Sequence, residues 1–170
     1  AAQELVQLQR VLPDGTSKFD GAGSNLTFFS WEEYDALVAS RAIANSGFAG
    51  TYCDDAQIKG EGPLSLSVVL ADGGFFALLG INAAAGRVLT QADHDTARPV
   101  AVLSHEFALQ HFESAGAAVG QTLVLHGAHF TIAGVLPRGF QGLVVGSPSH
   151  VFVPRSTFQL FQDRTNGQER

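Results

Sequence analysis

The sequence lacks several residue types on which whole classes of protein depend. Its 170 residues include no methionine and a single cysteine, Cys53. One cysteine excludes a disulfide within the chain and leaves the redox compartment open. Because methionine is missing even at position 1, we expect the chain to be a segment of a longer protein or a processed product, either of which leaves room for flanking membrane segments that have been removed.

Basic residues are also scarce. Lysine and arginine together number 10, against 16 aspartates and glutamates, which gives a net charge of −6. Nucleic acids and anionic membranes are both bound by clustered basic side chains, so the composition argues against both kinds of partner. The glycines of residues 21–24 and 73–74 fit neither phosphate-binding motif, GxxxxGK[ST] or GxGxxG, and we predict no nucleotide site.

Long apolar runs are absent as well. The longest candidate, residues 75–86, is interrupted by Gly80 and Asn82, and it falls short of the ~18 residues needed to cross a bilayer. No basic segment followed by an apolar one marks a signal peptide at the N-terminus. With 45% hydrophobic residues the chain can still bury a real core, which suits one domain or two small lobes.

Short-range patterns predict a mixture of strands and helices. Apolar alternation and short apolar runs between turn residues are typical of strands, and apolar residues three or four apart are typical of helices. On this basis the strands cover residues 4–12, 48–58, 64–70, 100–103, 122–125, 128–133 and 151–153, and the helices cover residues 31–44, 75–79 and 105–112. Residues 18–25 and 90–95 are expected to be loops.

Individual residues mark where these elements begin and end. Ser30 and Glu33 have the spacing of a capping box, in which each side chain satisfies a free backbone donor. Ser104 is expected to cap the helix that follows it, with Glu106 in the first turn, where the helix dipole favours a negative charge. Gly80 suits the left-handed position that closes a helix.

Residues 122–133 are typical of a β-hairpin. The turn is His126-Gly127, since glycine tolerates positive φ and histidine does so more often than most residues. Pairing Leu123 with Phe130 and Leu125 with Ala128 puts one apolar face toward a core.

The histidines do not have the spacing of a zinc site. His105 is followed by Glu106, as in zinc proteases, but the position four residues on is Leu109. His111 then lies about 120° away around the helix. His126 and His129 flank the hairpin turn, but two ligands are fewer than the three or four that zinc needs.

The acidic pairs are interpreted as solvated turns. Neither Asp54 and Asp55 nor Asp93 and Asp95 have the ligand spacing of a calcium loop. His94, between the second pair, is interpreted as a loop residue rather than a metal ligand.

Ser104 follows a strand and precedes a helix, where a hydrolase nucleophile would stand. The glycines of the GxSxG motif are replaced by Val102 and Glu106, so the strained turn of that motif cannot form. We therefore interpret Ser104 as a helix cap only. For the chain as a whole we predict no catalytic, cofactor-binding or metal-binding residue, and no cofactor.

Several segments, taken in order, resemble the MacB-like periplasmic core domain, which is found in permease subunits of MacB/FtsX/LolC-type ABC transporters. The matching segments are residues 72–86 (GxxFxxLGxxxxxGR), 86–95 (GR and ED), 99–104 (PVVVLS), 119–127 (VG and NG), 132–142 (VVGVxPxGFxG) and 151–154 (VWVP), with 29–34 (FSYPEY) upstream. The chain departs from the pattern at His126, where the family has asparagine, and at Trp31 and Glu32, where it has tyrosine and proline.

The resemblance implies an α+β fold with two small lobes. Residues 1–88 would form a porter-like βαβ lobe, and residues 89–155 an inserted mixed α/β lobe that contains the hairpin. Family members carry a further strand and helix after the VFVP-type strand, whereas this chain stops at Arg170. We therefore expect an incomplete first lobe, with residues 156–170 leading back to it.

The resemblance also implies a function and its partners. The chain would be a soluble, non-catalytic domain on the periplasmic face of the inner membrane, passing ATP-driven conformational change to periplasmic substrates or partners. It would work with a cognate ATPase through the missing membrane segments, in a permease homodimer or pseudo-dimer, and not with nucleic acid. A periplasmic partner protein would be met by exposed aromatic residues, for which Phe140 and Phe161 are the candidates.

Two other interpretations stay open. One is a small extracytoplasmic hydrolase or metal-dependent enzyme that uses His105, His111 or the hairpin histidines. The other is a stand-alone ligand-binding module with a pocket between the lobes.

Overall fold

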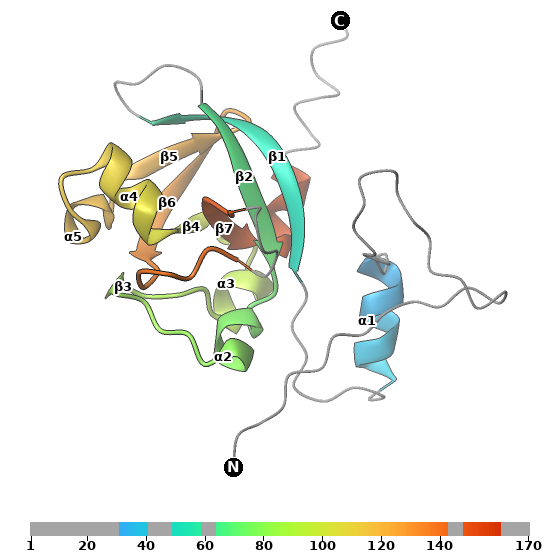
Figure 1. The fold of residues 1–170 in the computed structure, drawn as a ribbon. Helices are drawn as coiled ribbons and strands as arrows, with labels where there is room; N and C mark the ends of the chain where they lie inside the picture. Colours follow the sequence, from blue (N-terminus) through green and yellow to red (C-terminus); the bar gives the residue numbers. More distant parts are fainter. Residues whose placement is uncertain (1–30, 41–48, 59–63, 143–147, 161–170) are drawn as a thin grey trace, which may run out of the picture. The chain divides into compact units, whose positions relative to one another are not determined.

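A computed structural model describes residues 31–40, 49–58, 64–142 and 148–160 (Figure 1). The chain divides into two compact units, Ala1–Ser46 and Gly47–Arg170. Each unit is described by itself. No helix among the described residues is long and apolar enough to span a bilayer.

In the first unit the described element is helix α1 (Trp31–Ala39). Leu37, on its apolar face, is half-buried, whereas Val38 is 43% exposed. The helix begins at the predicted residue but ends at Ala39, five residues early; the Ser40 hydroxyl donates a hydrogen bond of 2.8 Å to the Leu37 carbonyl. The expected cap at Ser30 and the expected strand over residues 4–12 lie outside the described residues.

The described residues of the second unit form seven strands and five further helical elements. The strands are β1 (Ala49–Ile58), β2 (Leu64–Ala71), β3 (Ala85–Gly86), β4 (Val100–Leu103), β5 (Thr122–Leu125), β6 (Ala128–Val135) and β7 (Val151–Pro154). The helices are α2 (Phe75–Leu79), α3 (Gln91–Asp95), α4 (His105–His111), α5 (Ala115–Ala118) and the 3-10 helix η1 (Arg155–Phe158). The predicted strands from residue 48 onward and the helices at 75–79 and 105–112 are confirmed, and the α+β class with them.

The strands form one mixed sheet that curls until it closes on itself. Its order is β3-β6-β4-β7-β2-β1-β5, and β5 also pairs with β6. Closure therefore depends on β5, which is antiparallel both to β1 and to β6 (Figure 1). The β2–β7 and β4–β6 pairs are parallel and the others antiparallel.

This sheet contains strands from both sides of the lobe boundary expected near residue 88. β1 and β2 precede that boundary, and they pair with β5 and β7, which follow it. The division into lobes 1–88 and 89–155 stays a prediction, with the qualification that the two segments share a sheet.

The predicted hairpin is present in the predicted register. Leu123 lies opposite Phe130 and Leu125 opposite Ala128. His126 in its turn has a φ of 48°, in the left-handed region expected for it. Leu123, Leu125 and Phe130 are all fully buried, so the apolar face of the hairpin does face the core.

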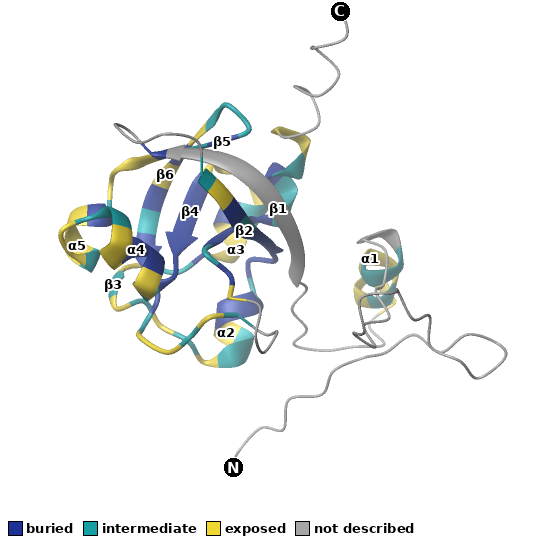
Figure 2. Ribbon diagram, turned by 45° about the horizontal axis from the view of Figure 1, so that its top comes forward, coloured by how far each residue is buried: buried dark blue, intermediate teal, exposed yellow. Residues whose placement is uncertain are grey.

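An aromatic cluster fills one part of the core, where α2 meets the sheet. The rings of Phe75 and Phe76 are 5.2 Å apart, and that of Phe76 is 5.4 Å from Phe152 on β7. Figure 2 shows buried residues along β4, with exposed ones on α4 and α5. The core is thus shared by helix α2, which precedes residue 88, and by strands that follow it.

Residues 90–95 are not the loop that was expected. They form the cap and body of α3, whose Thr90 and Asp93 make a complete capping box. The prediction failed because the five residues of α3 include a single apolar one, Ala92, and so show no apolar stripe. β3, α5 and η1 were also missed, and each is four residues or shorter.

Candidate functional site

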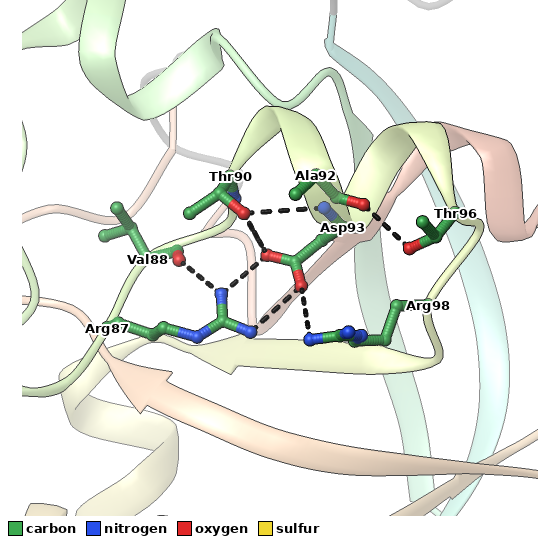
Figure 3. Close-up of polar contacts among 7 residues, drawn as sticks. All are labelled: Arg87, Val88, Thr90, Ala92, Asp93, Thr96 and Arg98. Carbon is green, nitrogen blue, oxygen red and sulfur yellow. Dashed lines mark hydrogen bonds and ion pairs between the residues drawn. The ribbon is translucent and has the colours of Figure 1, made fainter.

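The most organised polar group of the described residues is centred on the carboxylate of Asp93. We call Arg87, Thr90, Asp93 and Arg98 the Asp93 cluster (Figure 3). The Asp93 side chain is 1% exposed, although it is charged. A buried charge of this kind requires several partners, and the cluster supplies them.

Both oxygens of the Asp93 carboxylate have more than one partner. Oδ2 accepts hydrogen bonds from Arg87 and Thr90, and Oδ1 lies near the guanidinium groups of Arg87 and Arg98. The Arg87 guanidinium donates to both oxygens, with its Nη2 2.9 Å from Oδ1. Thr90 donates to Oδ2 twice, from its backbone nitrogen at 2.9 Å and from its hydroxyl at 2.7 Å. Arg98 Nη1 lies 3.9 Å from Oδ1, too far for a hydrogen bond.

These contacts fix the charge of Asp93. Burial favours the neutral acid and raises its pKa, but the hydrogen bonds from Arg87 and Thr90 outweigh that effect and lower the pKa to about 2. The same hydrogen bond to Asp93 raises the pKa of Arg87. A carboxylate with so low a pKa is a poor proton acceptor, so Asp93 does not act as a general base. Its role is structural, because it links α3 to the segment after β3.

The solvated-turn interpretation is therefore wrong for Asp93. Asp95 is exposed, as expected, but it lies in α3 and not in a turn, and it accepts a hydrogen bond of 2.8 Å from Gln91. Asp54 and Asp55 lie within β1 and not in a turn. The Thr90-x-x-Asp93 spacing was the available signal for the buried carboxylate, because it is the capping-box spacing with aspartate in place of glutamate.

Close backbone contacts place Arg87 in the cluster. The Arg87 nitrogen donates a 3.0 Å hydrogen bond to Ala133 of β6. A side chain at Gly134 would bring its Cβ within 2.2 Å of the Arg87 carbonyl oxygen, and one at Gly86 would come equally close to the Ala133 carbonyl oxygen. Only glycine at these positions allows β3 and β6 to approach so closely.

Ser104 is placed as the helix-cap interpretation predicts. It is 3% exposed, and its hydroxyl accepts a hydrogen bond of 3.3 Å from the Phe107 backbone nitrogen. Its own backbone nitrogen donates to the His150 carbonyl at 2.9 Å. The hydroxyl is occupied at the start of α4, where the prediction of an N-cap is confirmed.

The histidines that the sequence analysis considered as metal ligands lie at separate places in the fold. His105 and His111 are the first and last residues of α4, His126 lies in the hairpin turn, and His129 is an exposed residue of β6. Within the described ranges, no group of three or more histidine, cysteine, aspartate and glutamate side chains is arranged to hold a metal ion. His94 belongs to α3 and not to a loop.

Sequence reasoning did not single out His150, which connects three elements. Its Nδ1 accepts a 3.0 Å hydrogen bond from the Ser67 nitrogen, and its own nitrogen donates to the Ser67 carbonyl at 2.9 Å. Burial, followed by repulsion from His111, lowers the pKa of His150. Since Nδ1 is an acceptor, the neutral ring carries its proton on Nε2, a tautomer without a free lone pair for a metal.

Phe140 does not present the exposed ring that was expected for partner binding. It is half-buried, and its ring lies 6.4 Å from that of Phe76 and 5.9 Å from that of Phe152. It therefore extends the edge of the aromatic cluster. Phe161, the other candidate, lies outside the described residues.

Comparison with known proteins agrees with this fold. The periplasmic region of MacB from Actinobacillus actinomycetemcomitans superposes with a TM-score of 0.53 at 20% identity, covering 65% of this chain and 48% of that one. The extracellular domain of the noncanonic ABC-type transporter YknZ from Gram-positive bacteria superposes with a TM-score of 0.64 at 16% identity, covering 79% of this chain and 67% of that one. The chain thus spans about half the length of the MacB region.

No curated protein matches the sequence. The family model described as the MacB-like periplasmic core domain matches residues 3–169, nearly the whole chain. The ordered segments that carried the resemblance, from the residues around Gly86 to the VFVP strand, lie within that match. The chain belongs to the family of MacB-like periplasmic core domains, the periplasmic domains of MacB-type ABC transporter permeases.

Proposed function

We propose that the chain is the extracytoplasmic domain of an ABC transporter permease, and that it passes ATP-driven conformational change to substrates or partner proteins in the periplasm. The observation that carries this proposal is the family match over residues 3–169. In this role the domain lies at the periplasmic face of the inner membrane and does no covalent chemistry.

The construction of the second unit supports a mechanical role. A closed sheet with a packed interior resists deformation, so a displacement at one end reaches the other with little loss. Two partly buried ion pairs add to this stiffness. Arg87 holds Asp93 in the Asp93 cluster, and Arg155 Nε lies 3.0 Å from Asp72 Oδ1, which joins the end of β2 to η1.

The proposal includes the two lobes and the partners that the family resemblance implies. The lobes are residues 1–88 and 89–155, moving together through the sheet they share. The partners are a cognate ATPase, reached through membrane segments outside this chain, and a second permease subunit in a homodimer or pseudo-dimer. A periplasmic partner protein completes the set.

The catalytic alternative has less support from the site. The Ser104 hydroxyl caps α4, and His105 and His111 stand at opposite ends of that helix. Nucleophilic catalysis needs a base within hydrogen-bond reach of the nucleophile. In the described part of the chain, neither the contacts of Ser104 nor those of the Asp93 cluster supply such a base.

The proposal is tested with spin labels in the full-length permease reconstituted with its ATPase. Gln110 on α4 is exposed, so a Gln110→Cys label on a Cys53→Ser background reports the distance between two copies of the domain. We expect this distance to differ between the ATP-trapped and nucleotide-free states. A second pair within one copy, Gln110→Cys with Arg138→Cys, is the matched control and is expected to keep its distance.

Equal inter-copy distances in both nucleotide states would contradict the proposal. A change confined to the intra-copy pair would also contradict it, because the domain would then deform instead of moving as a body.

A further inference from the structure

The Asp93 cluster carries one more positive charge than its carboxylate balances. Arg87 and Arg98 both approach Asp93 Oδ1, at 2.9 Å and 3.9 Å. Their side chains are 43% and 61% exposed, whereas that of Asp93 is 1% exposed. The surface of the cluster is therefore cationic, on a chain whose net charge is −6.

The nearest acidic side chain in sequence does not cancel this charge. Asp95 lies two residues after Asp93 in α3, a rotation of about 200° around the helix, so it faces away from the arginines. It is engaged with Gln91 on its own helix.

Arg98 is held in place by its backbone, and its guanidinium is available. Its nitrogen donates a 2.9 Å hydrogen bond to the Asp93 carbonyl, and its carbonyl accepts one of 2.8 Å from Val100. Within the described residues its guanidinium makes no hydrogen bond, because its contact to Asp93 is 3.9 Å long. Figure 3 shows the ends of both arginine side chains at the same carboxylate.

We propose that Arg98, together with Arg87, anchors a carboxylate from an acidic segment of a partner protein. An arginine fork binds a carboxylate through two parallel hydrogen bonds, and Arg98 has its donors free for that geometry. Asp93 already holds Arg87, so of the two arginines only the Arg98 side chain has to be ordered on binding. This inference names a partner chemistry for the domain proposed above, and binding measured on the chain alone tests it separately from ATP coupling.

A protein segment fits this surface better than an anionic membrane does. A membrane is an extended negative surface, which would face the remaining charge of a chain with a net −6, and polybasic segments are what such surfaces attract. A short acidic segment meets only the two arginines. A single charged anchor at the rim of an interface sets register and orientation more than it sets affinity.

The experiment titrates the full chain with a hexaglutamate peptide at low salt, followed by two-dimensional NMR of the backbone amides. A hexaglutamine peptide and phosphatidylglycerol vesicles are the other probes. We expect hexaglutamate to shift the amides around residue 98 and hexaglutamine to leave them unchanged. Arg98→Gln should weaken hexaglutamate binding by up to about five-fold, the upper end of what one exposed charge contact contributes.

Arg138→Gln, which removes another exposed arginine, is the matched control and should bind as the parent does. Arg98→Lys keeps the charge without the fork and should bind with intermediate affinity. Because Arg98 is 61% exposed and its backbone contacts are unchanged, these variants are expected to keep the parent melting temperature.

Three results would overturn the proposal. The first is no shift with hexaglutamate, and the second is equal weakening by Arg98→Gln and Arg138→Gln, which would indicate general charge attraction. The third is Arg98-dependent binding to the vesicles without binding to the peptide, which would make a lipid headgroup the ligand.

Discussion

At the scale of single residues, two short helices end with the same hydrogen bonds but with different residues. After α2, Gly80 has a φ of 67°, and the Ile81 nitrogen donates to the Phe76 carbonyl at 3.0 Å. After α3, Ala97 has a φ of 46°, and the Arg98 nitrogen donates to the Asp93 carbonyl at 2.9 Å. A helix end of this kind has a residue with positive φ, which favours glycine, so the backbone of Ala97 is strained.

We expect Ala97→Gly to stabilise the chain by about 0.5 kcal/mol. The relief of left-handed strain exceeds the extra freedom that glycine gives the unfolded chain. Gly80→Ala is the matched reverse change, since a Cβ there meets no atom within 4 Å, and it should destabilise by about the same amount. Urea unfolding of both variants measures this, and shifts of the same sign would contradict it.

Because of Asp93, the free energy of unfolding should depend on pH in the acid range. The folded pKa of Asp93, about 2, is below the ordinary value, so its contribution is complete above pH ~4 and is lost as the pH falls through about 2. We expect Asp93→Asn to cost about 2 kcal/mol at pH 7, and about half as much at pH 3. Asp95→Asn, at an exposed site, is the control and should change little. A deficit that does not depend on pH would show that Asp93 acts through shape alone.

At the scale of elements, local patterns predicted what local contacts determine. The hairpin register followed from one turn and one apolar face, and the Ser104 cap followed from a single residue type at a strand–helix junction. The role of His150 could not be predicted in this way, because its partner Ser67 is 83 residues away. α3 was missed although its capping box was visible, since its one apolar residue, Ala92, makes no apolar stripe.

His150 joins β2 to the start of α4 and should respond to mild acid. Its folded pKa is lowered, so the neutral ring is favoured, and its contribution is present above pH ~6.5 and lost as the pH falls through the folded value. His150→Asn keeps an acceptor for the Ser67 nitrogen without the titration. We expect the parent to lose more stability than this variant between pH 7.5 and 5.5, measured by urea unfolding. Parallel losses would contradict this explanation.

The contact of β3 with β6 should tolerate no side chain at Gly134. A Cβ would lie 2.2 Å from the Arg87 carbonyl oxygen, and backbone atoms cannot move aside as a flexible side chain can. We expect Gly134→Ala to destabilise by about 2–4 kcal/mol, as overpacking does. Gly116→Ala in α5 is the control, because only Ser114 Oγ at 4.0 Å lies near, and it should be neutral or stabilising. Equal melting temperatures for the two variants would refute the close-contact argument.

At the scale of the whole molecule, the sequence indicated the class of fold but not the closure of the sheet. Strand lengths and turns are local properties. The pairing of Ala56 with Leu125 cannot be predicted from the sequence of either strand alone. The family resemblance did not supply the closure either, since it implied two lobes, and the match over residues 3–169 bears out the family alone. The Asp93 cluster could be predicted only in part. The spacing of Thr90 and Asp93 can be read from the local sequence, whereas the burial of the Asp93 side chain depends on distant parts of the chain.

Stability without a metal is expected of the chain as a whole. Protein purified without a histidine tag should contain less than about 0.2 zinc per chain and should keep its melting temperature in EDTA, since zinc sites need three or four converging ligands. Elemental analysis and thermal unfolding measure the two quantities. A full equivalent of zinc, lost on joint substitution of His126 and His129, would contradict the prediction.

The position of β5, which closes the sheet by pairing with both β1 and β6, also has a consequence for folding kinetics. β5 meets β6 across a two-residue turn, but it meets β1 at only three positions, Ala56, Gln57 and Ile58, on a distant part of the chain. Local pairing is fast, whereas distant pairing must first overcome the entropy of closing a long loop. The hairpin should therefore form early in refolding, and the β1–β5 pairing should be among the last contacts made and the first lost as the chain opens.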